Sequence, residues 1–323
     1  MNYICFNMFV DSKDVAINKL CKYFCLDEIA AENALQYGCS AESFINDLQI
    51  NLRNFDSSSV NIIGRHITTA SVDTISSFTE NGLYNLSQSL QFDTPLSRFL
   101  KRYGIRIDVE NKVFHFREWH IPISEKKTSD HICFKGRERV CTWYDGCEEF
   151  KKIASLGHKL YSLGATLEFF VAGTLDEMLD YSTVSHCPEI LDTIDQIICS
   201  LNNSYSTCTY PLCSNWITHY PQCYLVEFAS VLSNLDTYCP ISYLNAYSEI
   251  KESLKWSEVT YDDYYERRVP QRVFDNRYLI QTFISAYIYH DNEQYGSLQP
   301  GLSIPPSALT IYRIEDGQLK CLL

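Results

Sequence analysis

The chain contains little glycine or proline, few positive charges and no long hydrophobic run. Its 323 residues include only 12 glycines and 10 prolines, whereas 46% of them are hydrophobic and 14% are aromatic. This composition excludes fibrous and intrinsically disordered proteins, which are rich in glycine or proline or poor in aromatic side chains. A chain of this length and hydrophobic content can bury a full core, either as one large α+β domain or as two lobes.

Positive charge is scarce, because 27 lysines and arginines stand against 40 aspartates and glutamates, which gives a formal net charge of −13. Such a surface repels the phosphates of nucleic acids on average. We therefore expect nucleic acid to bind only through a local basic strip, for which the sequence offers Arg98, Lys101, Arg102 and Arg106.

No stretch reaches the roughly 18 uninterrupted apolar residues that a membrane helix requires. The N-terminus has no lysine or arginine ahead of its short apolar run, and Asp11 and Lys13 follow that run directly, which is unlike a signal peptide. We expect a cytoplasmic protein with no membrane partner, in which the 14 cysteines are mostly reduced.

Two common kinds of binding signature are missing. The sequence has no Gly-x-x-x-x-Gly-Lys and no Gly-x-Gly-x-x-Gly, which excludes P-loop and Rossmann nucleotide sites. It also has no Cys-x-x-Cys, so the sequence disfavours zinc and no metal ligands are assigned. Two irregular groups leave a zinc- or thiol-dependent module open as an alternative: His131 with Cys133, Cys141 and Cys147, and His219 with Cys208, Cys213 and Cys223.

Helical spacing dominates the first part of the chain, where Ile17, Leu20, Cys21 and Phe24 recur every three or four residues. A polar stretch at residues 56–59 then breaks the pattern. We predict a helical N-terminal unit over residues 1–56 and an α+β domain over residues 57–323.

The domain opens with a β-branched run that predicts a strand at residues 60–69. Ser71 can cap a helix over residues 72–81, after which Gly82 and Leu83 are placed to close a Schellman-type end. A second helix should begin near Thr94 and Pro95. The remaining expected elements are a hairpin over residues 106–116, helices at 148–163, 175–181, 188–200, 241–254 and 277–289, and strands at 118–123, 166–173, 224–228, 308–314 and 318–322.

His66 and Thr68 are two residues apart on the first predicted strand and should therefore point to the same face. An imidazole and a hydroxyl placed in this way could bind one polar ligand together. The alternative is a half-buried histidine whose ring is satisfied by a backbone carbonyl.

A His-x-Thr strand followed by a helix that ends in Gly82-Leu83 resembles the first βα unit of the NAD-dependent ADP-ribosyltransferases, which include toxins that modify DNA. The runs FDTPLSRF at residues 92–99, YGI at 103–105 and YYERRVP at 264–270 resemble AbiGi-type abortive-infection proteins. The resemblance covers residues 62–107 and 262–270. It implies a helical unit followed by a mixed α/β body with an ADP-ribosyltransferase-like split-sheet core, in a bacterial or phage defence or toxin system.

The resemblance also implies that NAD or a related nucleotide is the substrate. Cleaving the bond between nicotinamide and ribose passes through an oxocarbenium-like state, which needs a carboxylate near the anomeric carbon. Glu266 would be this carboxylate, His66 and Thr68 would hold the ribose and carboxamide side, and an aromatic ring would support the nicotinamide. The implied catalytic residues are His66, Tyr103 and Glu266, and the implied NAD-binding residues are Arg65, Thr68, Tyr84 and Arg267. Tyr103 or Tyr84 would supply the aromatic ring, and Arg267 or Arg268 would neutralise the pyrophosphate.

Two alternatives stay open. Glu227 is a second candidate carboxylate, because alternation along its strand could aim it into a cleft, although such a glutamate more often faces water. The protein could also be a non-catalytic antitoxin or defence regulator that keeps the same fold and binds a protein partner.

Overall fold

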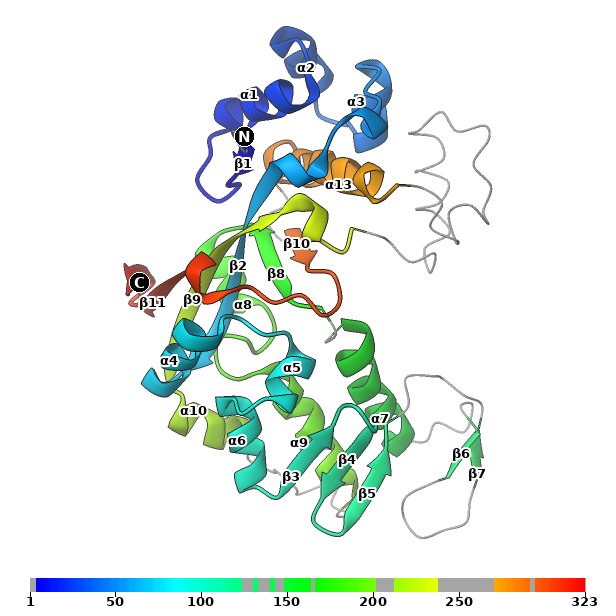
Figure 1. Cartoon of the computed structure of the whole chain (residues 1–323), viewed down its shortest axis with the longest axis vertical. Helices are drawn as coiled ribbons and strands as arrows, with labels where there is room; N and C mark the ends of the chain where they lie inside the picture. Colours follow the sequence, from blue (N-terminus) through cyan, green and yellow to red (C-terminus); the bar gives the residue numbers. More distant parts are fainter. Residues whose placement is uncertain are drawn as a thin grey trace. The chain divides into compact units, whose positions relative to one another are not determined.

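The computed structural model describes residues 4–123, 130–132, 140–142, 148–163, 166–201, 212–237, 270–290 and 294–322 (Figure 1). The chain divides into two compact units. Unit 1 consists of Met1–His66, Glu168–Met178 and Glu227–Gln299, and unit 2 consists of Ile67–Leu167, Leu179–Val226 and Pro300–Leu323. Two long strands, β2 (Val60–Ala70) and β9 (Gln222–Val231), contribute residues to both units.

Unit 1 combines helices with one side of a mixed sheet. In this unit the strand order is β10-β8-β2-β9, with β1 parallel to β2 and β8 antiparallel to β10. The N-terminal helices begin at well-defined caps; Ser12, for example, accepts a hydrogen bond from the backbone N–H of Val15 at the start of α1. The elements, besides β2 and β9, are β1 (Ile4–Phe6), α1 (Lys13–Phe24), α2 (Glu28–Ala34), α3 (Ala41–Asp47), β8 (Glu168–Ala172), α8 (Leu175–Asp180), α13 (Gln271–Tyr287) and β10 (Gln294–Ser297).

Buried polar side chains of helix α13 join it by hydrogen bonds to the other segments of unit 1. Asn276 is fully buried, donates to the carbonyls of Leu52 and Phe55, and accepts from the Tyr23 hydroxyl at 2.7 Å. The neighbouring Asp275 is also fully buried and accepts hydrogen bonds from the hydroxyls of Ser57 and Thr237. Because buried polar groups are costly when unsatisfied, these bonds fix the position of α13 against the N-terminal segment.

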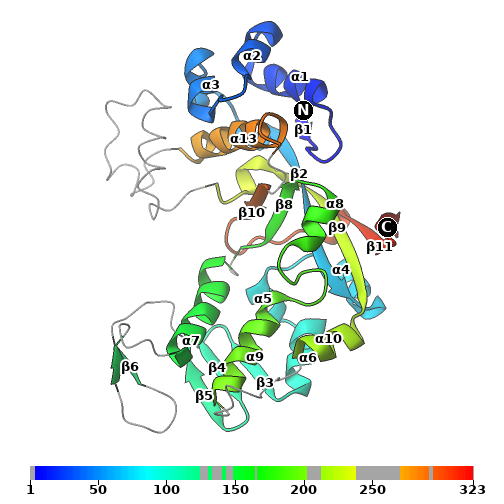
Figure 2. The same ribbon diagram turned by 180° about the vertical axis from the view of Figure 1, so that it is seen from behind.

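Unit 2 contains a three-stranded antiparallel sheet, β3-β4-β5, and helices that pack around it (Figure 2). Its core is formed by aromatic and aliphatic side chains that include Phe99, Phe114, Phe116, Leu156 and Leu191. The elements are α4 (Val72–Asn81), α5 (Leu86–Gln91), α6 (Pro95–Arg102), β3 (Ile105–Asp108), β4 (Val113–Phe116), β5 (Trp119–Pro122), β6 (Asp130–Ile132), β7 (Val140–Thr142), α7 (Glu148–His158) with a π-helical turn at Lys159–Leu163, α9 (Glu189–Leu201), α10 (Leu212–His219), β11 (Leu309–Glu315) and β12 (Gln318–Cys321).

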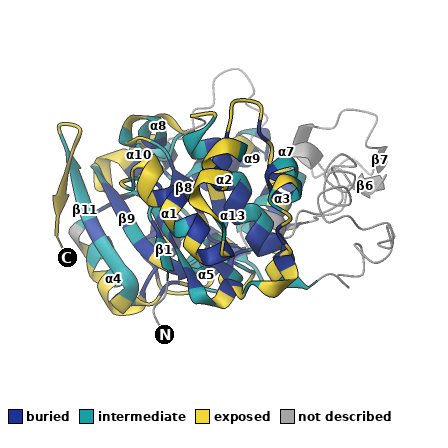
Figure 3. Cartoon of the chain, turned by 90° about the horizontal axis from the view of Figure 1, so that it is seen from above, coloured by how far each residue is buried: buried dark blue, intermediate teal, exposed yellow. Residues whose placement is uncertain are grey.

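The structure confirms the α+β class. The predicted strand at residues 60–69 is β2, and the helices predicted after Ser71 and Thr94 are α4 and α6. Among residues 73–81 of α4 only Thr74 is buried and the others are exposed or partly buried, as expected for a surface helix (Figure 3). The helix predicted at residues 241–254 lies outside the described residues.

The predicted Schellman-type end of α4 is wrong. Gly82 does end the helix with a positive φ of 84°, but its ψ of −166° is not that of the left-handed helical cap. The N–H of Leu83 instead donates to the carbonyl of Ile304 at 2.9 Å, and the Ile304 N–H donates back at 3.1 Å. A bridge to a distant segment of unit 2 thus replaces the local cap, which no local sequence pattern could reveal.

Among the described helices, none combines the length and the apolar character needed to cross a membrane.

Candidate functional site

The polar residues of β2 divide between the two faces of the strand. Gly64 and His66 share one face because side chains alternate along a strand, and Arg65 lies on the other. A Cβ at Gly64 would lie 2.6 Å from the Phe169 ring and 2.9 Å from the Phe228 ring, so only glycine fits there. His66 is thus the next residue on the same face beyond Gly64, where two aromatic rings pack against the backbone of the strand.

The half-buried ring of His66 is held by the neighbouring strand. Its Nδ1 lies 3.1 Å from the carbonyl oxygen of Glu168 on β8. A carbonyl only accepts, so Nδ1 carries the proton and donates it, which leaves Nε2 as the acceptor nitrogen of a neutral ring. Burial lowers the pKa of His66 and opposes the smaller effect of the backbone hydrogen bond, so the ring is neutral at pH 7.

This contact matches the alternative expected from the sequence, a half-buried histidine satisfied by a backbone carbonyl. The contact uses only Nδ1, because no hydrogen bond to Nε2 occurs among the residues that the structure describes. One nitrogen of His66 is therefore fixed, and within the described residues the other has no hydrogen-bond partner.

Arg65 is engaged on the opposite face of β2. Its Nε lies 2.8 Å from a carboxylate oxygen of Glu227 on β9, and its guanidinium lies 4.2 Å from the centre of the Phe9 ring. The two charged side chains are only 13% and 17% exposed. A pair this buried, stacked on an aromatic ring, is a structural contact that links two strands and the N-terminal segment.

The pairing also locates Glu227, the second candidate carboxylate. Glu227 meets Arg65, and Arg65 and His66 are consecutive residues of an extended strand. Glu227 consequently approaches the face of β2 opposite to His66, and the two side chains do not form one constellation. The sequence pattern showed that Glu227 could point toward a neighbouring element but not which face of β2 it would meet.

Thr68 lies two residues beyond His66 on β2 and belongs to unit 2. Its hydroxyl has no hydrogen bond within the described part of the chain, whereas that of the next residue, Thr69, accepts from the indole N–H of Trp216 at 2.7 Å. Thr69 is buried, and this bond joins the strand to α10. The sequence analysis missed this structural threonine because Trp216 is 147 positions away.

The two candidate aromatic platforms belong to unit 2. Tyr103 follows the last residue of α6, packs against the hydrophobic core of the unit, and lies 4.9 Å from Phe99 between ring centres. Tyr84 lies 5.0 Å from Phe92. His66 is in unit 1, so the three residues are not in one unit. Glu266 and Arg267 lie outside the described residues.

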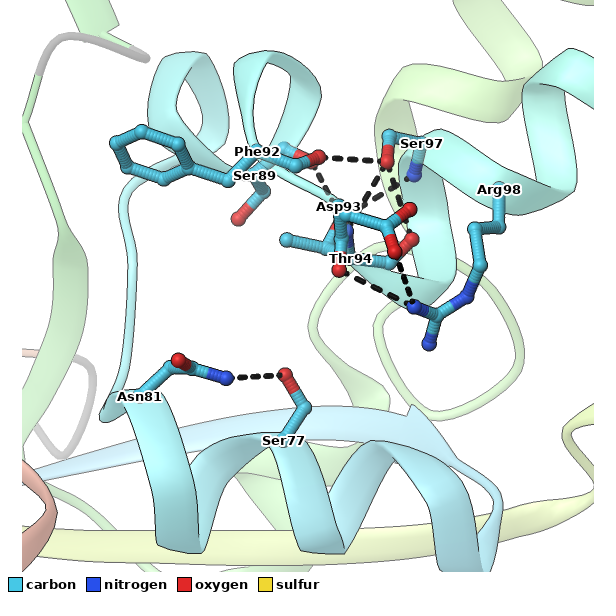
Figure 4. Close-up of polar contacts among 8 residues, drawn as sticks. All are labelled: Ser77, Asn81, Ser89, Phe92, Asp93, Thr94, Ser97 and Arg98. Carbon is cyan, nitrogen blue, oxygen red and sulfur yellow. Dashed lines mark hydrogen bonds and ion pairs between the residues drawn. The ribbon is translucent and has the colours of Figure 1, made fainter.

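The conspicuous run FDTPLSRF forms a helix entry (Figure 4). Thr94 and Ser97 make a capping box at the start of α6, with Pro95 in the first helical turn. The Ser97 hydroxyl also donates to the Phe92 carbonyl at 2.7 Å, and the Thr94 hydroxyl donates to that of Ser89. Every side-chain oxygen of this cap is thereby used to hold α5 against α6.

The charged residues of the same run form an exposed ion pair. The Arg98 guanidinium lies 3.1 Å from the Asp93 carboxylate, and the side chains are 42% and 73% exposed (Figure 4). A pair this open contributes little to stability. Arg98, the first residue of the predicted basic strip, is thus partly neutralised.

Two of the cysteines that the structure describes form a close pair that the sequence did not single out. Cys187 and Cys213 have their sulfurs 2.6 Å apart, although they are 26 positions apart in the chain. Within the described residues, no three side chains of the metal-ligating types gather at one place. Cys208 and the side chains of Cys133, Cys141 and Cys147 lie outside what the structure describes.

Comparison with protein-family models, with curated protein sequences and with solved structures finds no match for this chain.

Proposed function

We propose that the chain is an ADP-ribosyltransferase-like protein that uses NAD, of the kind that acts in bacterial or phage defence and toxin systems. The observation that supports this most strongly is the state of His66. Its Nδ1 is fixed by the Glu168 carbonyl and its pKa is lowered by burial, so a neutral ring presents Nε2 as an acceptor. A ribose hydroxyl is a suitable donor for such a nitrogen.

The β2–α4 segment gives the proposal its second support. His66 and Thr68 lie on one strand, and the helix that follows begins at Ser71 and ends at Gly82, as in the first βα unit that the sequence resembles. The finer proposal of a split-sheet ADP-ribosyltransferase core rests on this segment and on the resemblance.

Glu266 would act as the carboxylate that stabilises the oxocarbenium-like state when the nicotinamide leaves. Arg267 would bind the pyrophosphate, for which a guanidinium offers paired donors. Arg65 is a weaker candidate for NAD binding than the sequence suggested, since binding would require it to leave Glu227 and Phe9.

Radiolabelled NAD tests the proposal on the full chain, with double-stranded DNA and a protein mixture offered as separate acceptors. We expect the wild type to release nicotinamide and to transfer or hydrolyse ADP-ribose, and Glu266→Gln to lower the rate by at least about 100-fold. Asp93→Asn, which alters an exposed ion pair, is the matched control and should keep the wild-type rate.

The assay also distinguishes the proposed enzyme from a non-catalytic regulator. Saturable NAD binding without turnover in the wild type would favour a non-catalytic regulator on the same fold. Neither binding nor turnover in the wild type would overturn the proposal.

A further inference from the structure

Cys187 and Cys213 bring two free thiols together in unit 2. Cys187 lies in the turn before α9, and Cys213 is the second residue of α10. The sulfurs are 2.6 Å apart, well within the reach of a bond between them. A disulfide has a sulfur–sulfur distance of about 2.05 Å, so the two sulfurs have only about half an ångström to close.

Hydrogen bonds fix both sides of the pair. The N–H of Cys187 donates to the Thr183 carbonyl at 2.8 Å, and the Thr183 hydroxyl donates to the Cys187 carbonyl at 3.2 Å. On the other side, the Asp195 carboxylate of α9 accepts the N–H of Leu212 at 3.1 Å, which anchors the first turn of α10. The turn, α9 and α10 thus hold the sulfurs in place independently of any bond between them.

The two thiols differ in access. Cys187 is only 2% exposed, whereas Cys213 is half-buried, so an external reagent reaches Cys213 first. The thiols share one hydrogen bond, which stabilises the singly ionised pair, lowering the pKa of Cys187 and raising that of Cys213. The negative charges of Asp192 and Asp195 oppose ionisation of both thiols.

We propose that Cys187 and Cys213 form a reversible dithiol–disulfide site that a low-molecular-weight disulfide oxidises. The shared proton moves to Cys187 as the Cys213 thiolate attacks one sulfur of the oxidant, whose S–S bond breaks and releases one thiolate. The released thiolate takes the proton of Cys187, and the Cys187 thiolate then attacks the Cys213 sulfur of the mixed disulfide, whose S–S bond breaks and releases the second oxidant sulfur as a thiolate. Two electrons pass from the protein thiols to the oxidant, and one S–S bond replaces another.

Neither thiol belongs to a residue that is assigned to NAD chemistry. The site also fits a disulfide better than a metal, since no third ligating side chain joins the two sulfurs within the described residues. The inference gives a specific role to two of the 14 cysteines.

The test uses the reduced full chain, oxidised glutathione as the probe, and alkylation of the remaining thiols before peptide mapping. No lysine or arginine lies between Lys159 and Lys251, so trypsin leaves both cysteines in one peptide. Chymotrypsin cleaves after aromatic residues unless proline follows, so cuts after Tyr205 and Trp216 release residues 206–216, in which peptide fragmentation distinguishes Cys213 from Cys208. We expect a cross-linked pair of peptides that contain Cys187 and Cys213, and its loss after treatment with dithiothreitol.

Variants identify the order of attack. Cys187→Ser should stop at glutathione bound to Cys213, Cys213→Ser should leave Cys187 unmodified, and Cys199→Ser on α9 should keep the cross-link as the matched control. The proposal is overturned if Cys187 and Cys213 stay open to alkylation while exposed thiols such as Cys25 have reacted, or if either cysteine pairs with another one. The wild-type map decides this by itself if a serine variant fails to fold.

Discussion

Arg65 of β2 and Glu227 of β9 form a largely buried ion pair, with the arginine Nε 2.8 Å from the glutamate Oε2. The pair lies on the face of β2 opposite to His66, and Phe9 covers the guanidinium at 4.2 Å. Arg65 and His66 are neighbours on one strand, but their side chains lie on opposite faces and therefore have different roles. Arg65 stabilises unit 1, and Nε2 of His66 has no hydrogen bond to the residues that the structure describes.

Replacing Glu227 by Gln should destabilise unit 1 without abolishing NAD turnover. The substitution leaves the Arg65 charge half-satisfied in a site where the side chains are 13% and 17% exposed, and we expect a loss of roughly 1–3 kcal/mol of unfolding free energy. Urea denaturation measures the loss. Asp93→Asn breaks the exposed pair with Arg98 and should cost less than about 1 kcal/mol. Equal losses in the two variants, or loss of turnover in Glu227→Gln alone, would contradict the structural role of the pair.

Gly82→Ala should destabilise unit 2 far more than Gly104→Ala. Both glycines have a positive φ, 84° and 70°, which costs any other residue about 1 kcal/mol or more. Only at Gly82 would the new Cβ lie 2.0 Å from a backbone oxygen, that of Ile304, whereas no atom lies within 4 Å of a Cβ at Gly104. We expect Gly82→Ala to lower the unfolding free energy by at least about 2 kcal/mol more than the control. Similar urea midpoints for the two variants would contradict this prediction, because they would show that the backbone at Leu83 and Ile304 shifts to accommodate the new Cβ at little cost.

Oxidation of the Cys187–Cys213 pair should stabilise unit 2. A disulfide across 26 positions restricts the unfolded chain and contributes roughly 3 kcal/mol in the chain-entropy description. Urea denaturation of the oxidised and reduced wild type measures the difference, and Cys213→Ser under the same two conditions is the control. A gain that persists in Cys213→Ser would assign the stabilisation to other cysteines.

The stability of unit 2 should fall as the pH rises from about 4 to 7, because of Asp195. Burial raises the pKa of this carboxyl to about 7 in the folded chain, with a smaller contribution from the charge of Asp192. Between the unfolded value near 3.9 and this value, the folded state binds more protons than the unfolded state, so stability is lost as the carboxyl ionises. The loss should be of order 1–2 kcal/mol after allowance for solvent screening.

Asp195→Asn tests this directly, because the amide keeps an acceptor for the N–H of Leu212 but carries no charge at any pH. Its unfolding free energy should depend less on pH over this range than that of the wild type, and it should exceed the wild-type value at pH 8. An unchanged pH profile would mean that the Asp195 carboxyl ionises in the folded chain as it does in the unfolded one.

Local signals in the sequence predicted much of the secondary structure. Capping residues, β-branched runs and helical spacing located β2, α4 and α6, because each of these elements is specified by neighbours in the chain. The half-buried state of His66 was expected for the same reason, as one alternative for a histidine on a strand.

Contacts over long distances in the chain could not be predicted in this way. The Leu83–Ile304 bridge, the Thr69–Trp216 hydrogen bond and the Cys187–Cys213 pair each join segments whose separation leaves no periodic trace. The roles of Glu266 and Arg267 stay predictions, since these residues lie outside the described part of the chain.

Calorimetric titration of NAD into the wild type and into His66→Ala at pH 7.5 tests the central claim most directly. The neutral His66 ring should accept a hydrogen bond from the ribose, so we expect saturable binding by the wild type and a loss of at least about tenfold in affinity for the variant, or about 1.4 kcal/mol. Asp93→Asn should bind as the wild type does. A wild type that does not bind NAD, or a folded His66→Ala variant that binds it equally well, would contradict the account.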